Sequence, residues 1–419
     1  MKILIKNVIL NGKTVDIYVN GGKIEDIGTE LKKEADKLIN GAGKVALPSF
    51  INGHTHAAMT LFRGYADDMP LKKWLEEKIW VLERKLTEED VYWGAKLACL
   101  EMIKNGITVF NDMYWHWEAT ARATYEMGLR GFISAVFIDM FDKKKAEQQV
   151  ELNLKLFDLS KKYSPNVTFT LGPHAIYSVS KESLIWANEF SRKNGILIHM
   201  HVSETEEEVK FAMEKYGMRP VEFLDSLEMI SEKFIGCHGC WLDENECEIL
   251  GKKGGRIVHM PVSNMKLTVG RVVPHSLFSK YGVTYCLGTD GCASNNHLDM
   301  IETMKFASLL AKFSTGDPTI LPAKEVFQLA TKKAAHIFNL GEWDLNVGSY
   351  ADIILVDMER PEFVPNFDLF SDMVYATNGS CVDTVICMGN VIMENRVVPG
   401  EEEILRNVKK VAKSLIERE

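Results

Sequence analysis

Long stretches of positive charge are missing from this sequence. Its 419 residues include 49 Lys and Arg against 58 Asp and Glu, which gives a formal net charge of −9. A negative chain without a basic tract is a poor partner for nucleic acid or an anionic membrane surface. No apolar run reaches the length of a membrane span, and the opening residues MKILIKNVIL lack the apolar core of a signal peptide. We therefore expect a cytoplasmic protein with neither nucleic acid nor membrane as a partner.

Phosphate-binding and structural-metal motifs are missing as well. No GxGxxG or GxxxxGKS/T segment follows an apolar run, which argues against binding of a nucleotide phosphate. The eight cysteines are scattered, and the CxxC segment Cys237-His-Gly-Cys240 has no second pair to complete a zinc ribbon. We expect these cysteines to be reduced thiols, as in intracellular proteins. The sequence contains no internal repeat and no low-complexity segment.

The middle of the chain alternates between apolar and amphipathic segments. Eight strand-like runs, from KVALPSFING to VTYCLGTDG, are separated by helical stretches such as LTEEDVYWGAKLACLEMIKN. In that stretch Thr87 and Asp90 have the spacing of a capping box at a helix start. The alternation predicts an α/β protein built on a (β/α)8 TIM-like barrel. A doubly wound open sheet is the alternative.

Both ends of the chain contain short alternating runs with Asn-Gly, Gly-Gly and Gly-Asn turns. These runs predict a small β-sandwich domain formed from both termini, with residues 1–47 and 347–400. The barrel is expected over residues 48–346. Residues 401–419 are charged and amphipathic, which predicts a C-terminal surface helix.

Polar side chains follow nearly all of the predicted barrel strands. His54 and His56 are two residues apart in PSFINGHTHAAMT, so they point to the same face of a strand. The carboxyl ends of barrel strands meet at one face, where residues distant in sequence converge. The candidates at these ends are His54, His56, Asp112, His174, His199, His201, Glu204, His238, His259, Asn264 and Asp290.

The two histidines of ILIHMHVSE face the same way, and only one is needed in a site. His201 lies nearer the mouth of the barrel, so we assign it to a metal and place His199 in a lower, structural layer. His259 is left open between packing and function. The remaining histidines are expected on the surface or on helices, namely His116, His275, His297 and His336.

Three histidines and one aspartate suit a borderline divalent ion, with zinc first and iron or manganese as competitors. Such an ion lowers the pKa of water to about 7. Glu204 is placed to shuttle a proton to a leaving group, and His238 to orient the attacking water. The residues predict hydrolytic attack on an electron-poor carbon, with an amine, amide or halide leaving.

The segments PSFINGHTHAAMTLFRG, GPHAIYS, HMHVSET, SNMKL and LGTDGCASNN resemble, in this order, the amidohydrolase superfamily. The resemblance covers essentially the whole chain and is closest to the methylthioadenosine/S-adenosylhomocysteine deaminase and chlorohydrolase-like branch. It implies one divalent metal per subunit, zinc first, held by His54, His56, His201 and Asp290. Dinuclear members carboxylate a lysine on the fourth strand, and VTFTLGPHA contains none.

The same resemblance implies roles for the residues around the metal. Glu204 is implied as the proton shuttle, His238 as the residue beside the attacking water, and Asp290 as both ligand and proton acceptor. The implied substrate contacts are Glu83, His174, Glu204 and Ser294. Family members commonly form dimers or tetramers, so we expect a homo-oligomer with a small nucleoside-like substrate.

Three departures from the family pattern bear on the substrate. Members that use S-adenosylhomocysteine carry arginines where this chain has Ala135 and Gln149, and those arginines neutralise the homocysteine carboxylate. Because charge-assisted pairs are strong contacts, we expect S-adenosylhomocysteine to be a poor substrate. Met260 replaces an asparagine after His259, and we expect it near the mouth, where it makes the base pocket less polar.

The leading hypothesis is a deaminase that converts a 5′-substituted adenosine (methylthioadenosine, 5′-deoxyadenosine or adenosine) to the inosine derivative and ammonia. The alternatives keep the site but change the substrate to guanine, cytosine or an s-triazine ring, or release chloride. Glu204 favours deamination because ammonia needs a proton to leave and chloride does not. A non-catalytic homologue is a weaker hypothesis, since all the implied ligands are present. A zinc nucleic-acid deaminase is excluded because the H-x-E…P-C-x-x-C signature is missing.

Overall fold

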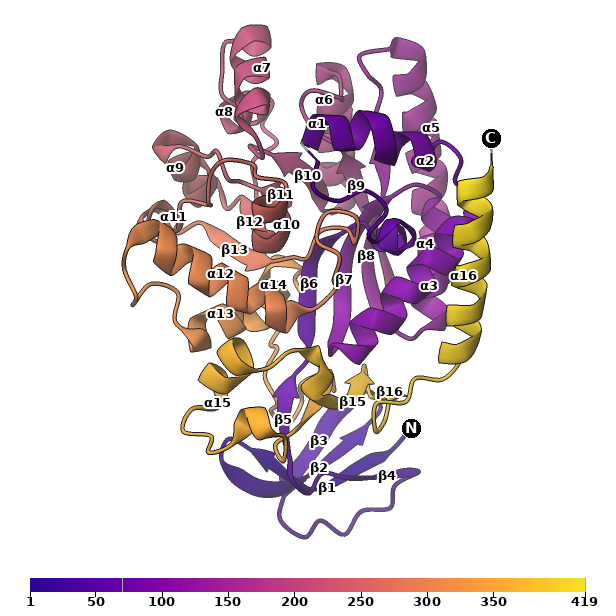
Figure 1. The fold of residues 1–419 in the computed structure, drawn as a ribbon, viewed down its shortest axis with the longest axis vertical. Helices are drawn as coiled ribbons and strands as arrows, with labels where there is room; N and C mark the ends of the chain where they lie inside the picture. Colours follow the sequence, from indigo (N-terminus) through magenta and orange to yellow (C-terminus); the bar gives the residue numbers. More distant parts are fainter. Residues whose placement is uncertain (70, 419) are drawn as a thin grey trace.

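The computed structural model describes residues 1–69 and 71–418, with all their side chains except those of residues 71 and 72. A barrel forms the upper part of the molecule, and a smaller sheet lies beneath it (Figure 1). Eight parallel strands, each paired with the next along the chain, form the barrel and confirm the (β/α)8 prediction. They are β6 (Phe50–Thr55), β7 (Ile107–Tyr114), β8 (Arg130–Phe137), β9 (Val167–Pro173), β10 (Ile198–Val202), β11 (Phe234–His238), β12 (Arg256–His259) and β13 (Thr284–Leu287).

The barrel closes between its first and last strands. The backbone N–H of Asp290, just beyond β13, donates to the carbonyl of His54 in β6 at 3.0 Å. A Cβ atom on Gly53 would lie 2.7 Å from the Sγ of Cys286, and one on Gly288 would lie 2.7 Å from the backbone N of His54. Only glycine allows such a close approach of the two strands. The seam therefore brings the end of β6 and the residues after β13 together.

Helices cover the outside of the barrel (Figure 1). The predicted capping box is present at the start of α3 (Glu88–Lys104), where the Thr87 N–H donates to the Asp90 carboxylate at 2.8 Å and the Asp90 N–H donates to the Thr87 hydroxyl at 3.3 Å. The other helices are α1 (Leu71–Trp74), α2 (Trp80–Glu83), α4 (Trp117–Glu126), α5 (Lys143–Ser160), α6 (Lys181–Asn194), α7 (Glu206–Tyr216), α8 (Pro220–Ser226), α9 (Glu244–Lys253), α10 (Pro261–Lys266), α11 (His275–Tyr281), α12 (Met300–Thr315), α13 (Ala323–Leu329), α14 (Lys332–Ile337) and α15 (Leu369–Ser371).

Strands from both ends of the chain share the second sheet, which has its own hydrophobic core. The turn between its first two strands has φ values of 50° at Asn11 and 76° at Gly12, the left-handed pair that an Asn-Gly hairpin predicts. The division of the chain at residues 47 and 347 stays a prediction. The strands are β1 (Ile3–Leu10), β2 (Lys13–Asn20), β3 (Lys23–Gly28), β4 (Lys37–Asn40), β5 (Lys44–Pro48), β14 (Ile353–Asp357), β15 (Val382–Cys387) and β16 (Asn390–Met393).

The last helix, α16 (Glu401–Glu417), runs along α3 at the side of the barrel (Figure 1). One face buries aliphatic side chains, including Val408 and Leu415, while the other is charged. Arg418 then pairs with the buried carboxylate of Asp90, with Nη2 and Oδ1 at 2.8 Å. The end of the chain is thereby attached to the capping box of α3.

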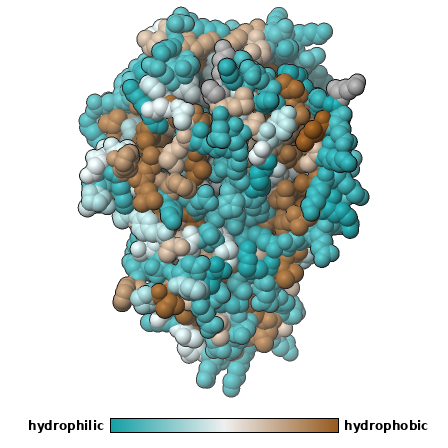
Figure 2. Space-filling view, in the orientation of Figure 1, coloured by the Kyte–Doolittle hydropathy of each residue, from teal (hydrophilic) through white to brown (hydrophobic). Residues whose placement is uncertain are grey.

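Most of the surface in Figure 2 is hydrophilic, and the hydrophobic residues gather in separate patches. Within residues 1–69 and 71–418, no helix has the length and apolar character needed to cross a membrane. All eight cysteines are buried and unpaired, as expected for reduced thiols.

Candidate metal centre and substrate cavity

Five of the predicted residues meet at the carboxyl end of the barrel. His54 and His56 come from the end of β6, His201 from β10 and His238 from the end of β11, and Asp290 follows β13. The ring centre of His54 lies 4.8 Å from that of His56 and 5.0 Å from that of His201. The Oδ1 atom of Asp290 lies 3.4 Å from Nε2 of both His54 and His56. The barrel thus converts residues from four separate segments into one compact cluster.

Each of the four imidazoles is held through Nδ1, so that Nε2 is the nitrogen left for the cluster. A carbonyl oxygen can only accept, so an Nδ1 bonded to one carries the proton and Nε2 keeps its lone pair. Metal-binding histidines are oriented in this way. The partners of Nδ1 are the Met113 carbonyl for His56 (2.7 Å), the His174 carbonyl for His201 (3.0 Å), Asn264 Oδ1 for His238 (2.8 Å) and His199 Nε2 for His54 (2.8 Å).

Burial favours the neutral form of two of these imidazoles. It lowers the pKa of His54 to about 4 and the pKa of His201 well below its ordinary value. Burial alone would raise the pKa of Asp290, but the nearby histidines, His54 and His56 foremost, hold it well below the usual range. Neutral imidazole nitrogens and one carboxylate are the ligands that zinc prefers, and Nε2 of His54 is buried without a hydrogen-bond partner in the described residues. The cluster therefore fits a divalent metal ion.

The carboxylate of Asp290 is fixed by three donors. The hydroxyls of Ser263 and Ser294 donate to Oδ2 at 2.6 and 3.0 Å, and the Gly291 N–H donates to Oδ1 at 2.8 Å. Ser294 also lines the inner end of the cavity, where it was predicted to contact substrate. The structure places its hydroxyl on Asp290, and its contact with substrate stays a proposal.

The other strand histidines lie away from the cluster mouth. His199 is one layer below His54, with Nε2 also 3.1 Å from the Sγ of Cys237. His259 is fully buried, and its ring lies 5.6 Å from that of His275. His275, expected on the surface or on a helix, is the first residue of α11, and its side chain is buried.

Glu204 lies beside His238 at the inner end of the cavity. Its Oε2 atom is 3.7 Å from the Nε2 of His238, and burial raises the pKa of the carboxyl group. The preceding residue, Ser203, has a left-handed backbone with φ of 50°, which turns the chain from β10 toward α7. The N–H of Glu204 donates to the Oε2 of Glu208 at 2.9 Å. A protonatable carboxyl group is therefore held in place close to the metal cluster.

Glu208 provides a pH-dependent prediction. Burial raises its pKa to about 8, so the folded protein keeps a proton that the unfolded chain releases above about pH 4.5. Wild-type stability consequently falls as pH rises through this window. Glu208→Gln does not titrate and keeps an acceptor for the Glu204 N–H. We expect the free energy of unfolding of the variant, relative to wild type, to increase by about 3.5 kcal/mol between pH 5 and pH 8.

Urea unfolding at the two pH values measures this difference. Glu207→Gln is the matched control, because Glu207 lies in the same helical turn but is exposed. A stability difference between wild type and Glu208→Gln that does not change with pH contradicts the prediction.

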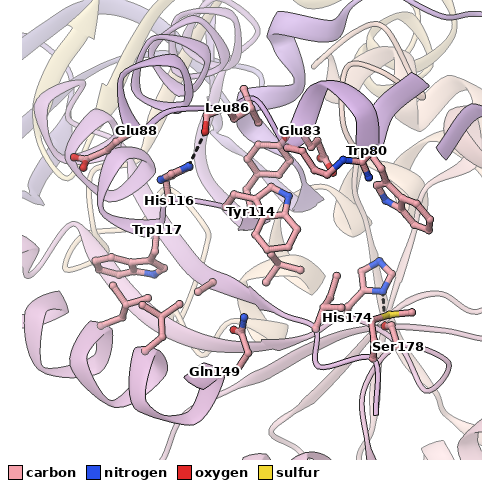
Figure 3. Close-up of a pocket in the computed structure, with 18 of the residues that line it drawn as sticks. Trp80, Glu83, Leu86, Glu88, Tyr114, His116, Trp117, Gln149, His174 and Ser178 are labelled. Atoms are coloured by element: carbon pink, nitrogen blue, oxygen red, sulfur yellow. Dashed lines mark hydrogen bonds between the residues drawn. The ribbon is translucent and has the colours of Figure 1, made fainter. Parts of the chain in front are cut away.

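A cavity of about 830 Å³ opens beside the cluster (Figure 3). It is continuous with a smaller inner space lined by His56, His201, Glu204, His238 and Asp290, because the two share one set of lining residues. This shared set is Trp80, Glu83, Tyr114, Trp115, Val136, Ile138, His174 and Tyr177. The volume is within the range of enzyme pockets for small molecules.

The two predicted outer substrate contacts, Glu83 and His174, face this space from opposite sides (Figure 3). Burial raises the pKa of Glu83, and the nearby side chains of Tyr114 and Trp115 offset part of this rise. Burial lowers the pKa of His174 to about 3, and its Nδ1 bonds the hydroxyl of Ser178 at 2.8 Å. A neutral imidazole and a buried carboxyl group thus flank the passage from the outer cavity to the cluster.

Ala135 and Gln149 both line the outer cavity, where the arginines of S-adenosylhomocysteine-using relatives were aligned. The Oε1 atom of Gln149 is buried and has no hydrogen-bond partner in the described residues. The expectation for Met260 was wrong. Met260 is fully buried in a hydrophobic cluster with Val258 and Cys286, and it lines neither part of the cavity, because the first turn of α10 points it into the barrel.

The sequence reasoning missed the aromatic walls of the cavity. Trp80, Tyr114, Trp115 and Tyr177 line it, and none was a candidate. His116 was expected on the surface or on a helix, but it lines the cavity from the start of α4, with Nε2 bonded to the Leu86 carbonyl at 3.2 Å (Figure 3). One signal in the sequence could have identified these residues: the run Met113-Tyr-Trp-His116 directly follows the candidate Asp112.

The fold and the cluster together define a barrel enzyme of the metal-dependent hydrolase class. Comparison with known proteins gives the family: residues 45–392 match the model of the amidohydrolase family, and the chain belongs to this family. A 5′-deoxyadenosine deaminase from Methanoregula boonei is 46% identical over 99% of this chain and 96% of its own length. A 5-methylthioadenosine/S-adenosylhomocysteine deaminase from Archaeoglobus fulgidus is 46% identical over 99% of both chains. A zinc-bound crystal structure of an adenosine deaminase from Xanthomonas campestris superposes with a TM-score of 0.93 at 28% identity, covering 100% of this chain and 98% of that one.

Proposed function

We propose that this protein deaminates a 5′-substituted adenosine (methylthioadenosine, 5′-deoxyadenosine or adenosine) to the inosine derivative, with release of ammonia. The observation that carries the proposal is the protonatable Glu204 carboxyl group beside His238, where a histidine–aspartate cluster lines the inner end of the cavity. The deaminase relatives at 46% identity support the same reaction.

The metal ligands proposed here are His54, His56, His201 and Asp290, with one zinc ion per subunit. Their convergence and the lowered pKa values of His54 and His201 support this assignment. When bound, the ion supplies activation of water at neutral pH. The zinc in the related adenosine deaminase structure supports zinc over iron or manganese.

The protein's own groups carry the protons. Water, oriented by His238 through Nε2, adds to the carbon that bears the amino group; Asp290 accepts one of its protons and passes it to the neighbouring ring nitrogen. Glu204 delivers a proton to the leaving nitrogen as the C–N bond breaks and takes back the remaining hydroxyl proton as the carbonyl forms, so that one water and one amine give a carbonyl and ammonia. Glu83 and His174 are proposed to hold the ribose end of the substrate, which their position between the two parts of the cavity supports.

The test of this function is a spectroscopic assay of the zinc-loaded protein. Conversion of adenine to hypoxanthine changes the ultraviolet spectrum, so turnover of methylthioadenosine, 5′-deoxyadenosine and adenosine is followed directly. We expect turnover of the first two. Metal-loaded protein without turnover of any of these substrates contradicts the proposal.

Substrate choice gives a second prediction. A carboxylate that lacks its charged partner loses about 1.5–3 kcal/mol of binding. Ala135 and Gln149 stand where arginines would neutralise the carboxylate. We therefore expect kcat/KM for S-adenosylhomocysteine to be at least about 10-fold below that for methylthioadenosine, which corresponds to the loss of about 1.5 kcal/mol. Gln149→Arg is expected to narrow the ratio, and Gln149→Leu, the control, is not. Equal efficiencies for the two substrates in the wild type contradict this assignment.

We further propose a cytoplasmic homo-oligomer. The eight unpaired thiols support the compartment. Exposed apolar side chains on α12, among them Leu309 (44% exposed) and Phe313 (89% exposed), support association, and Figure 2 shows hydrophobic residues on the flank where α12 lies. Light scattering of the purified protein tests the oligomer, and a monomer at micromolar concentration contradicts it.

A further inference from the structure

The outer cavity is larger than the proposed substrates require. Its 830 Å³ lies near the upper end of the range for pockets that enclose drug-sized ligands, whereas a nucleoside is a small ligand. The inner space holds the groups proposed to act on the base, and Glu83 and His174 stand at its junction with the outer cavity. A nucleoside bound with its base at the cluster therefore directs its 5′ carbon toward the outer cavity.

Apolar side chains form the far wall of the outer cavity. Trp117 at the start of α4 and Leu156 in α5 are each at most 9% exposed, and both line the outer cavity but not the inner space. The charged residues that line this space are mainly acidic: Glu83, Glu88 and Glu118, against Arg84. Such a wall favours an apolar group, and its charge disfavours an anion.

The rim of the cavity is also apolar and open. Met140 is 56% exposed, Leu152 is 42% exposed and Trp80 is 38% exposed, and all three line the cavity. Exposed apolar residues gathered around a cavity mark a surface that binds ligand. A substituent longer than the far wall therefore meets further apolar side chains at the rim.

We propose that the outer cavity binds a large apolar 5′ substituent, an alkylthio or arylthio group well beyond methylthio, and that adenosines carrying such groups are better substrates than methylthioadenosine. This inference rests on the proposed deaminase function. The apolar far wall, with Trp117 and Leu156, and the apolar rim, with Leu152, supply the selectivity.

A homologous series of substrates tests the inference. Zinc-loaded enzyme is assayed with 5′-alkylthio-5′-deoxyadenosines from methyl to hexyl, with the benzylthio compound, and with a carboxypropylthio compound as the anionic analogue. Burying a methylene favours binding by about threefold to fourfold. We expect kcat/KM to rise about threefold per methylene as far as butyl, mainly through KM, and the anionic compound to lie at least about tenfold below butyl.

Two leucines of α5 provide matched variants. Leu156→Asn places an amide on the proposed wall, and Leu152→Asn places one at the rim. Both are expected to weaken the dependence of kcat/KM on chain length. Leu154 lies between them in sequence, is 43% exposed and does not line the cavity, so Leu154→Asn is expected to keep the wild-type dependence. Leu152 is at the rim, so its variant provides the test if Leu156→Asn fails to fold.

The outcomes separate this inference from the proposed function. A flat or falling series with methylthioadenosine turnover intact overturns the inference and leaves the deaminase in place. If Leu154→Asn weakens the dependence of kcat/KM on chain length as strongly as Leu152→Asn does, the assigned wall is wrong. Failure to deaminate any adenosine overturns the proposed function and the inference with it.

Discussion

Replacing Glu204 by glutamine lowers kcat for deamination by about 10³-fold, while the protein keeps its metal and its fold. The amino group leaves readily only after it is protonated to ammonia, and the glutamine amide has no acidic proton to transfer. The Glu204 carboxyl group is positioned for this task because Oε2 lies 3.7 Å from His238 and burial raises its pKa. Its backbone N–H bonds Glu208, and that contact is unchanged in Glu204→Gln.

Steady-state kinetics and metal analysis of the same preparation measure this effect. Glu206→Gln serves as the control, since Glu206 is two residues further along, pairs with Lys210 at 2.9 Å and is exposed. We expect the control to stay within about twofold of wild type, as is usual for an exposed residue. A Glu204→Gln enzyme with near wild-type kcat removes Glu204 from the proton transfer.

Replacing His201 by alanine removes one of the proposed metal ligands and is expected to abolish measurable turnover. Loss of a group that only supports a ligand costs 10- to 100-fold in metal affinity, so loss of the ligand itself should cost at least about 100-fold. His201 is the proposed ligand from β10, and its Nδ1 is anchored on the His174 carbonyl at 3.0 Å. Its removal leaves only His54, His56 and Asp290 of the four proposed ligands.

Elemental analysis and zinc-dependent thermal shifts report on binding independently of activity. The wild type is expected to gain thermal stability with added zinc, because an ion that binds the folded state stabilises it, and His201→Ala is expected to gain little. His336→Ala is the matched control, because His336 lies exposed on α14. Stoichiometric zinc in His201→Ala would show that this residue is not a ligand.

Much of the site was predictable because the relevant signals are local. The two-residue spacing of His54 and His56 fixes their shared face, and the same holds for His199 and His201. Position along the strand then separated His201, in the cluster, from His199, one layer below. Parallel strands in a barrel end at one face, so strand assignment alone was enough to bring residues from distant segments together.

The cavity was less predictable because several separate segments build it. Trp80 comes from the segment after β6, His116 from the end of β7 and Gln149 from α5. Nothing in the local sequence states which of these side chains faces inward. Met260 was placed wrongly for the same reason: its position after a strand suggested the mouth, but the turn into α10 directs it into the hydrophobic interior.

The sequence by itself determined the barrel, the terminal sheet and the residue types at the strand ends, since periodicity and strand-end position are local properties. Only the tertiary structure decided how three strand ends turn. Ser203, His238 and Asp290 have left-handed backbones, with φ of 50°, 75° and 64°. This conformation costs an L-residue about 1–2 kcal/mol, so no local preference selects it. Contacts made elsewhere hold it, such as the Asp290 N–H bond to the carbonyl of His54, and they aim the cluster at the cavity.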